Sequence, residues 1–197
     1  MLPAGDAELV QIVDKAFADA AMRSGAWLAC RPGCNQCCTG VFRISLLDRE
    51  RLRHGLVLLQ QQDPTAALPL MHRIQQARDR LAGGFPGDAA SGVLGSSEDA
   101  VDAFEDFANE EVCPVLDPAG GTCSLYAHRP ITCRTFGPPV QTDGGAYGVC
   151  ELCFVGAPET AVRNGELHLP DPAREEALLL DTGGDSETIV AFAFLGT

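Results

Sequence analysis

Apolar residues recur every three or four positions along residues 6–24, which is the spacing of one face of an α-helix. In residues 6–24, Leu9 and Val13 belong to such a stripe, Asp6 stands where it can cap the helix, and Gly25 follows as a stop. Two more helices are predicted: one opened by a capping box of Ser45 and Asp48, and one from Asp63-Pro64 to Gly83-Gly84, interrupted at Pro69.

The middle of the chain mixes weak and strong patterns. Residues 84–97 are small or polar with little periodicity, which predicts a mobile loop. Residues 98–111 contain seven acidic side chains in fourteen positions, which predicts a helix with a solvated face. The inner face of that helix is expected to carry Val101, Phe104, Phe107 and Ala108.

Four shorter patterns complete the predicted secondary structure. A short strand is expected at residues 41–44, a tight turn at Asn164-Gly165, a helix from Asp171-Pro172 to about Asp181, and a strand at residues 189–195. The pattern predicts one α+β domain over residues 1–197, with several helices around a short β-hairpin or sheet and a cysteine metal site. The cysteine-containing core spans residues 30–153, and the N-terminal helix and C-terminal residues 171–195 are expected to pack on it.

The net charge of the chain limits the classes of binding partner that we expect. The net charge of −13 disfavours binding to the phosphate backbone of nucleic acids. The first twenty residues are acidic rather than basic and apolar, and no apolar run is long enough to cross a bilayer, so neither a secretory signal nor a membrane span is predicted. We expect a cytoplasmic protein in a reducing compartment whose partner is a metal ion or cluster; no protein partner can be named.

Nine cysteines change the picture most. An odd number of cysteines without an export signal argues against a disulfide framework and favours metal or redox chemistry. They fall into three sequence groups: Cys30, Cys34, Cys37 and Cys38; then Cys113, Cys123 and Cys133; then Cys150 and Cys153.

The second group lies on a predicted hairpin. Residues 112–116 and 122–126 flank the five-residue loop 117–121. Pairing Leu116 with Thr122 places Cys113 diagonal to Cys123, about 7–8 Å apart at Cα. That separation suits two thiolates that share a metal, and it is too long for an easy disulfide.

The stretches Cys113-Pro-Val-Leu, Cys123-Ser-Leu-Tyr and Arg129-Pro-Ile-Thr-Cys133-Arg-Thr-Phe resemble the YkgJ family of cysteine-cluster proteins, also called the CxxCxxCC family. Cys34, Cys37 and Cys38 match the end of the family's opening motif, whereas three residues separate Cys30 from Cys34 instead of two. The resemblance spans about residues 30–153 and implies a zinc- or iron-chelating domain without a defined reaction. The family pattern and the predicted hairpin geometry together rank Cys34, Cys37, Cys123 and Cys133 as the firmest ligands, then Cys113, then Cys38, Cys150 and Cys153, and Cys30 last.

Residues beside the cysteines suggest supporting roles. Arg129 and Arg134 lie close enough in sequence to offset the negative charge of a bound cluster and to lower thiol pKa values; the alternative is that they only form salt bridges with the acidic helix. Tyr126 and Phe136 are expected to cover the site and exclude water. His128 is a less favoured nitrogen ligand, more typical of a surface histidine.

The spacing leaves the metal and the number of sites open. All-thiolate donors suit both zinc and iron–sulfur clusters, and the triplet Cys30, Cys34 and Cys37 favours a [4Fe–4S] cluster over zinc. In an extended segment Cys37 and Cys38 would point in opposite directions, so nine cysteines could serve two four-thiolate sites or one cluster plus packed thiols.

The triplet also has radical SAM spacing, but Gln36 replaces the usual aromatic residue and the repeated βα pattern is missing. No motif establishes an enzyme. A metal-binding module, an iron–sulfur redox enzyme or electron carrier, and a metal-handling accessory protein all stay open.

Ligands from three distant segments should make metal a clamp between them. Removing metal with a chelator should therefore lower the melting temperature and make Cys34, Cys37 and Cys133 reactive towards thiol reagents. The checks are thermal unfolding and thiol counting before and after chelation. An unchanged melting temperature with no newly reactive thiol would place the metal at the periphery.

Overall fold

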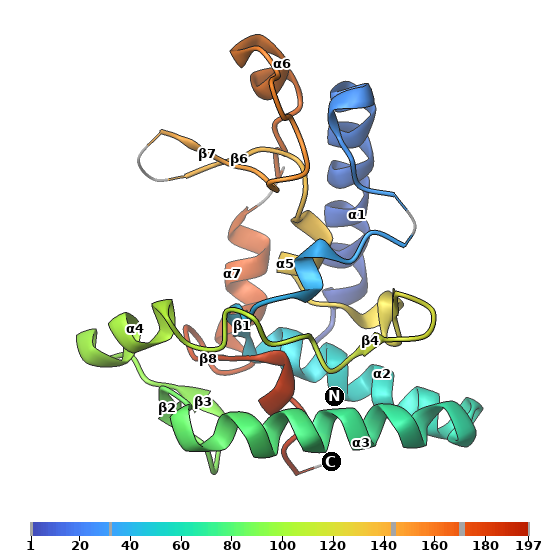
Figure 1. Cartoon of the computed structure of the whole chain (residues 1–197), viewed down its shortest axis with the longest axis vertical. Helices are drawn as coiled ribbons and strands as arrows, with labels where there is room; N and C mark the ends of the chain where they lie inside the picture. The colour runs from blue at the N-terminus through green and yellow to red at the C-terminus, as the bar shows by residue number, and fades with distance from the viewer. Residues whose placement is uncertain (1, 32, 143–144, 170–171, 197) are drawn as a thin grey trace.

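Two long helices packed side by side form the base of the molecule (Figure 1). They are α2 (Leu46–Gln62) and α3 (Pro64–Leu81), and only Asp63 separates them. The Asp63 carboxylate accepts a hydrogen bond from the Ala66 amide at 2.9 Å and caps α3. The interruption predicted at Pro69 is wrong: the helix continues through it, because its neighbours Ala67 and Leu70 are fully buried against the rest of the structure.

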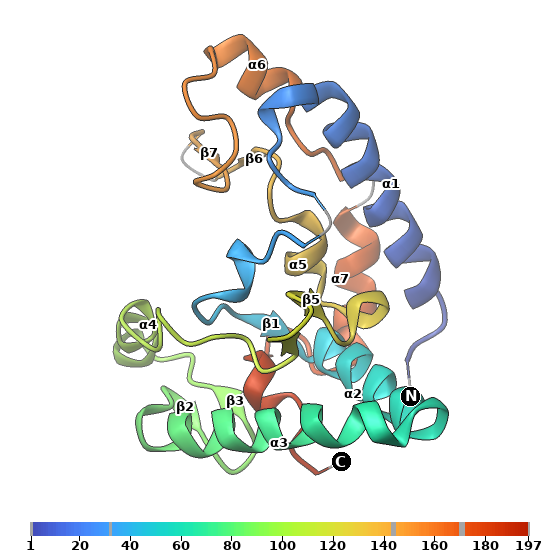
Figure 2. The same cartoon turned by 45° about the vertical axis from the view of Figure 1, so that its right-hand side comes forward.

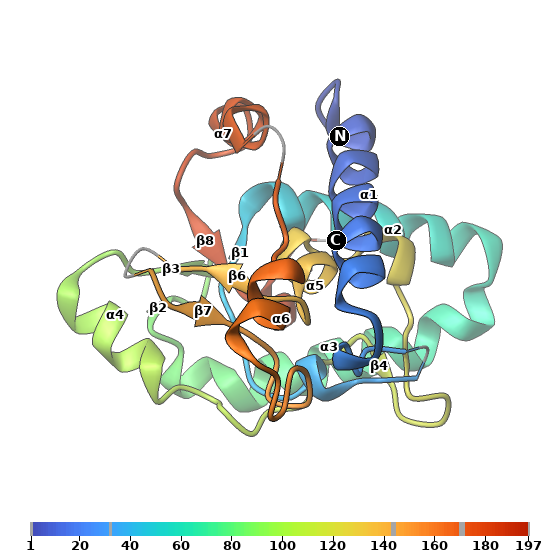
Figure 3. The same ribbon diagram turned by 90° about the horizontal axis from the view of Figure 1, so that it is seen from above.

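Above this base stands α1 (Asp6–Ser24), as the sequence predicted (Figure 2). The computed structural model describes residues 2–31, 33–142, 145–169 and 172–196. Seen from above, the short helix α5 (Ile131–Thr135) lies between α1 and α7 (Pro172–Leu180) (Figure 3). The other α-helices are α4 (Glu98–Glu105) and α6 (Glu159–Asn164).

The strands are two residues long and pair into four antiparallel two-stranded sheets within the described residues. Their pairing joins β1 (Ile44–Ser45) with β8 (Glu187–Thr188), β2 (Gly87–Asp88) with β3 (Val93–Leu94), β4 (Leu116–Asp117) with β5 (Thr122–Cys123), and β6 (Val140–Gln141) with β7 (Tyr147–Gly148). The architecture is α+β, as expected. Across those same residues, no helix is both long and apolar enough to cross a membrane.

The C-terminal strand expected at residues 189–195 is wrong. Regular pairing ends at Thr188, and Val190–Phe192 form a buried 3-10 turn in the apolar clusters that include residues of α2, α3 and β3. Ile189 to Phe194 are all buried. A run that is apolar on every side carries no periodicity, so it cannot distinguish a strand from a buried turn.

Two predictions in the middle of the chain also need correction. Residues 84–97 contain the hairpin β2–β3, which the core holds through the buried Phe85 and Leu94. The acidic helix ends at Glu105 rather than near residue 111, since Ala108 adopts a left-handed backbone with φ 54°. Val101 is exposed instead of facing the core.

The helix expected near the C-terminus is present, and the turn expected at Asn164-Gly165 is part of a helix end. The turn at Asn164-Gly165 is the end of α6, which Gly165 terminates. The helix expected from Asp171-Pro172 is α7; Asp171 itself lies outside the described residues.

A buried ion network ties α1 to α2. Arg51 Nε donates to Asp6 at 2.8 Å and Arg51 Nη1 donates to Asp48 at 2.5 Å, and all three residues are at most 5% exposed. Asp6 therefore serves as a buried counter-ion, and the cap expected of it is wrong: the N-cap residue is Gly5. Half of the expected capping box is present, because Ser45 Oγ accepts the Asp48 amide at 3.1 Å while the Asp48 carboxylate turns towards Arg51.

Replacing Arg51 with Met should lower the free energy of unfolding by about 3–5 kcal/mol, because two buried carboxylates would lose their shared cation. Urea unfolding measures the loss. The matched control is Arg163→Ala, which removes an exposed pair with Glu159 and should leave the free energy of unfolding almost unchanged. Equal effects of the two substitutions would contradict a structural role for the network.

Candidate metal centre

All nine cysteines lie among the described residues, none forms a disulfide, and the structure sorts them into two groups. The hairpin group consists of Cys37, Cys38, Cys113, Cys123 and Cys133, which act on one another electrostatically. The loop group consists of Cys30, Cys34, Cys150 and Cys153, which do the same. The sequence triplet Cys30, Cys34 and Cys37 is thereby split, because Cys37 belongs to a different group from Cys30 and Cys34.

A tight 3-10 turn, Gln36–Cys38, carries two cysteines into the hairpin group. The Cys38 amide donates to the Asn35 carbonyl at 2.8 Å, so the segment is not extended. The condition under which Cys37 and Cys38 would point apart is therefore not met, and their thiols hydrogen-bond to each other. The Cys113 amide donates to the Cys38 carbonyl at 2.8 Å, which fixes this turn beside the hairpin.

The hairpin itself has a different register from the one expected. Leu116 pairs with Cys123 and Asp117 with Thr122, so the loop has four residues rather than five. The Asp117 carboxylate accepts the Gly120 amide at 3.0 Å, and this side-chain turn draws the loop in by one residue. The diagonal placement of Cys113 and Cys123 was derived from the wrong pairing, yet both thiols lie in the hairpin group.

Helix α5 brings the last member of this group, Cys133. The Asp48 carboxylate accepts the Ile131 amide at 3.0 Å and so binds the first residue of α5 to α2. Arg134, 3% exposed, donates to both carboxylate oxygens of Asp14 on α1 at 2.8 Å. These two polar contacts join α5, and therefore Cys133, to α2 through Asp48 and to α1 through Asp14.

The loop group is built around one close pair. Cys30 Sγ lies 3.9 Å from Cys153 Sγ. The Cys153 amide donates to the Cys150 carbonyl at 2.8 Å, which closes a tight turn, and the Phe154 amide donates to the Trp27 carbonyl at 2.8 Å, which docks that turn beside Cys30.

Gly137 allows the close approach of Cys30. Its φ is +128°, and a β-carbon built there would lie 2.6 Å from Cys30 Sγ. Sequence reasoning missed this residue. The only clue was its place in Phe136-Gly-Pro-Pro, directly after the Cys133 motif.

Backbone amides point at three of the sulfurs. Those of Val115 and Leu116 hydrogen-bond to Cys113, that of Leu125 to Cys123, and that of Leu152 to Cys150. In each case a donor lies two residues after the cysteine. Such donors favour the thiolate, which is the form that binds metal.

Without a cation, burial opposes ionisation in the hairpin group. Burial raises the pKa of Cys113 to about 12, and burial followed by neighbouring thiols raises that of Cys133. Burial likewise raises the pKa of Cys123, although Arg129 and Arg134 act in the opposite direction.

Cys37 is the exception. The hydrogen bond from Cys38, helped by Arg129, lowers its pKa to about 6, and the same bond raises the pKa of Cys38.

In the loop group, burial and the nearby Cys153 raise the pKa of Cys30 to about 12, and burial also raises that of Cys150. Among the described residues no three His, Cys, Asp or Glu side chains already converge on one point as a closed metal site. The donor chemistry nevertheless fits zinc or iron, since both groups offer at least four thiols with amide donors at their sulfurs. A bound cation would draw the thiols together and displace their protons.

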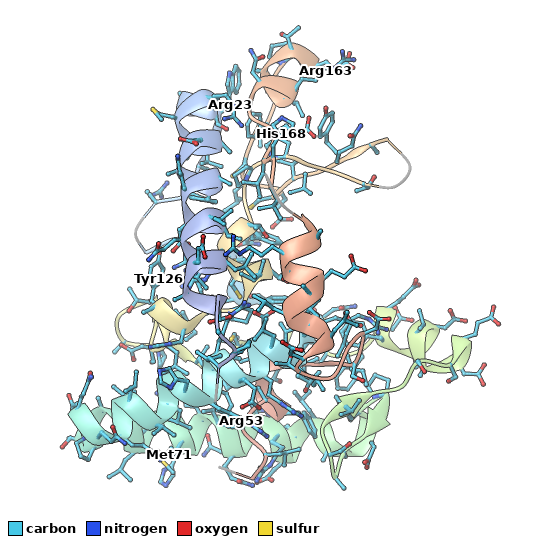
Figure 4. All side chains as sticks on the ribbon, turned by 180° about the vertical axis from the view of Figure 1, so that it is seen from behind. Arg23, Arg53, Met71, Tyr126, Arg163 and His168 are labelled. Atoms are coloured by element: carbon cyan, nitrogen blue, oxygen red, sulfur yellow. The ribbon has the colours of Figure 1, made fainter. Side chains whose placement is uncertain are left out.

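The residues expected beside the site have mixed outcomes. Arg129 and Arg134 act on the hairpin group, and both pair with Asp14 of α1, not with the acidic helix named as their alternative partner. Tyr126 and Phe136 do not cover the site: they are 63% and 41% exposed, and Figure 4 shows Tyr126 at the edge of the molecule. The Arg129 guanidinium instead stacks on the Tyr126 ring, 3.9 Å from its centroid.

His128 is half-buried and packs edge-on against His54, with ring centroids 5.5 Å apart. Burial, His54 and Arg134 lower its pKa. The His128 ring therefore packs against His54, which lies on α2, and this agrees with the low rank of His128 as a metal ligand.

Comparison with known proteins gives one match. The family model CxxCxxCC, described as "Putative zinc- or iron-chelating domain", matches residues 29–151, more than half of the chain. No curated protein and no solved structure matches the chain significantly.

In metal-free, reduced protein, Cys37 should be alkylated by iodoacetamide ahead of Cys30 and Cys113. A lowered pKa means that Cys37 becomes thiolate as the pH rises through about 6, whereas the other two stay protonated until about pH 12. Mass spectrometry of the alkylated peptides between pH 5 and 9 measures the profile. A common midpoint near the ordinary thiol value of about 8.5 would contradict this arrangement.

Proposed function

The chain belongs to the CxxCxxCC family, and from that premise we propose that it chelates iron or zinc through the hairpin group. The observation that carries the proposal is that five thiols from three segments far apart in sequence lie close enough to act on one another electrostatically. The segments are the turn Gln36–Cys38, the hairpin and α5. Four thiolates complete either a zinc site or the ligand set of a [4Fe–4S] cluster, so this group supplies enough donors with one to spare.

The surroundings favour a bound, negatively charged thiolate centre. Amides of Val115, Leu116 and Leu125 direct N–H dipoles at the sulfurs, and the guanidinium groups of Arg129 and Arg134 add positive charge on the same group. Cys113 and Cys123 also pack against the main apolar core, which keeps water away. Hydrogen bonds and burial of this kind tune iron–sulfur centres in general.

We favour a [4Fe–4S] cluster as the occupant of the hairpin group, with zinc as the alternative. The splitting of the Cys30, Cys34 and Cys37 triplet removes the spacing argument for the cluster. What supports it now is the five-thiol donor set with its two arginines. These donors also suit a zinc tetrathiolate, so metal analysis decides between the two.

The redox-carrier and metal-delivery roles both presuppose this chelation. A cluster in the hairpin group would supply one-electron chemistry, while Arg129 and Arg134 would bind and orient it and the apolar core would exclude water. A labile ion would instead suit delivery to a client protein.

Anaerobically purified protein should be brown, with broad absorption at roughly 400 nm, and should contain iron and acid-labile sulfide. Cys133→Ser should lose most of that absorption, because a hydroxyl is a poor ligand for iron or zinc. The matched control is Thr132→Ser, one residue earlier on α5, which should retain it.

Colourless protein with stoichiometric zinc and no sulfide would assign zinc instead of the cluster. Wild-type protein that binds neither metal, or full metal content in both the Cys133→Ser and the Cys123→Ser variants, would refute chelation by the hairpin group.

A further inference from the structure

The loop group draws on a part of the chain that the family match does not cover. The match ends at residue 151, while Cys153 lies beyond it and its sulfur lies 3.9 Å from that of Cys30. The neighbours that act on Cys30 are Cys34, Cys150 and Cys153, all members of the loop group. A second centre with its own ligand set is therefore available beside the hairpin group.

The spacing of the close pair suits a single ion. Zinc–sulfur bonds of about 2.3 Å in a tetrahedron place two sulfurs about 3.8 Å apart. The Cys30 and Cys153 sulfurs lie 3.9 Å apart without a disulfide. This pair already spans one edge of such a tetrahedron, and Cys34 and Cys150 are the donors that can complete it.

The frame around the group is fixed and apolar. Cys150 and Cys153 are 5% and 3% exposed, in a cluster with Phe154. Partly buried apolar neighbours pack on this cluster: Leu28, Ala29, Ala157 and Val162. A shell of this kind excludes water that would compete for the metal.

Two contacts hold the loops in register. The Leu152 amide donates to the Cys150 sulfur, the bond expected where a Cys-x2-Cys turn wraps around an ion. The Gln36 side-chain amide donates to the Glu151 carboxylate, which ties the turn after Cys34 to the turn that carries Cys150.

We propose that Cys30, Cys34, Cys150 and Cys153 form a second, separate site that binds one tetrahedral divalent cation of the zinc type. It deepens the proposed function, yet it stands or falls independently of which metal the hairpin group holds. Binding replaces the four thiol protons, which are released to solvent, with four sulfur–metal bonds. The ion would fasten the segment after α1 to the segment before α6.

The test is anaerobic reconstitution of metal-free full-length protein with zinc, and then with cobalt(II) as a spectroscopic probe. Wild-type protein should bind two zinc ions per chain, and both Cys153→Ser and Cys133→Ser should bind one. Cobalt spectra of each variant should keep the tetrahedral thiolate bands of the remaining site. Gly137→Ala, which crowds Cys30, should lose the same ion as Cys153→Ser; Gly184→Ala, with φ +60° and no atom within 4 Å, is its control.

The outcomes separate the two proposals. Wild-type protein that binds one ion, lost in Cys133→Ser and unaffected by Cys153→Ser, would overturn the second site and leave chelation by the hairpin group intact. One ion lost only in Cys153→Ser would refute the hairpin group and support the second site. Loss of both ions in Cys153→Ser, or in Cys30→Ser, with native circular dichroism would overturn the independence of the sites.

Discussion

The tight turn at Gln36–Cys38, pinned by the Cys113 amide to the Cys38 carbonyl, determines how the thiols divide. It commits Cys37 and Cys38 to the hairpin while Cys34, three residues earlier, stays with Cys30. An extended segment would have sent the two adjacent thiols in opposite directions. The division into five and four thiols follows from this one local conformation.

Polar anchors set the position of the other ligands. Asp48 connects α2 to the start of α5 and shares Arg51 with Asp6 of α1, while Arg134 binds α5 to Asp14. Cys133 is thereby held by a framework of ion pairs that contains no cysteine. We expect the fold to survive loss of metal in part, with the cysteine loops loosening more than the base formed by α2 and α3.

The sequence correctly predicted features that depend on local residue patterns. The helix over residues 6–24, the cap at Ser45, the helix start at Asp63-Pro64 and the α+β class were confirmed, because periodicity and helix-start residues are local properties. The family resemblance was confirmed for residues 29–151.

What failed depended on tertiary contacts. The hairpin register depends on a hydrogen bond of the Asp117 side chain, and the apolar residues 189–195 show no periodicity. The Asp6 carboxylate pairs with Arg51 and therefore does not cap α1. The partition of the cysteines could not be read from spacing, since Cys30 and Cys153 are 123 residues apart in the chain. Their ligand roles stay predictions.

The most direct test of the account is staged metal release combined with differential alkylation, in which mass spectrometry follows each cysteine separately. The account predicts two sets that lose protection as units, the hairpin group and the loop group, with Cys34 and Cys37 in different sets. Joint loss of protection at Cys30, Cys34 and Cys37, independent of Cys150 and Cys153, would contradict it.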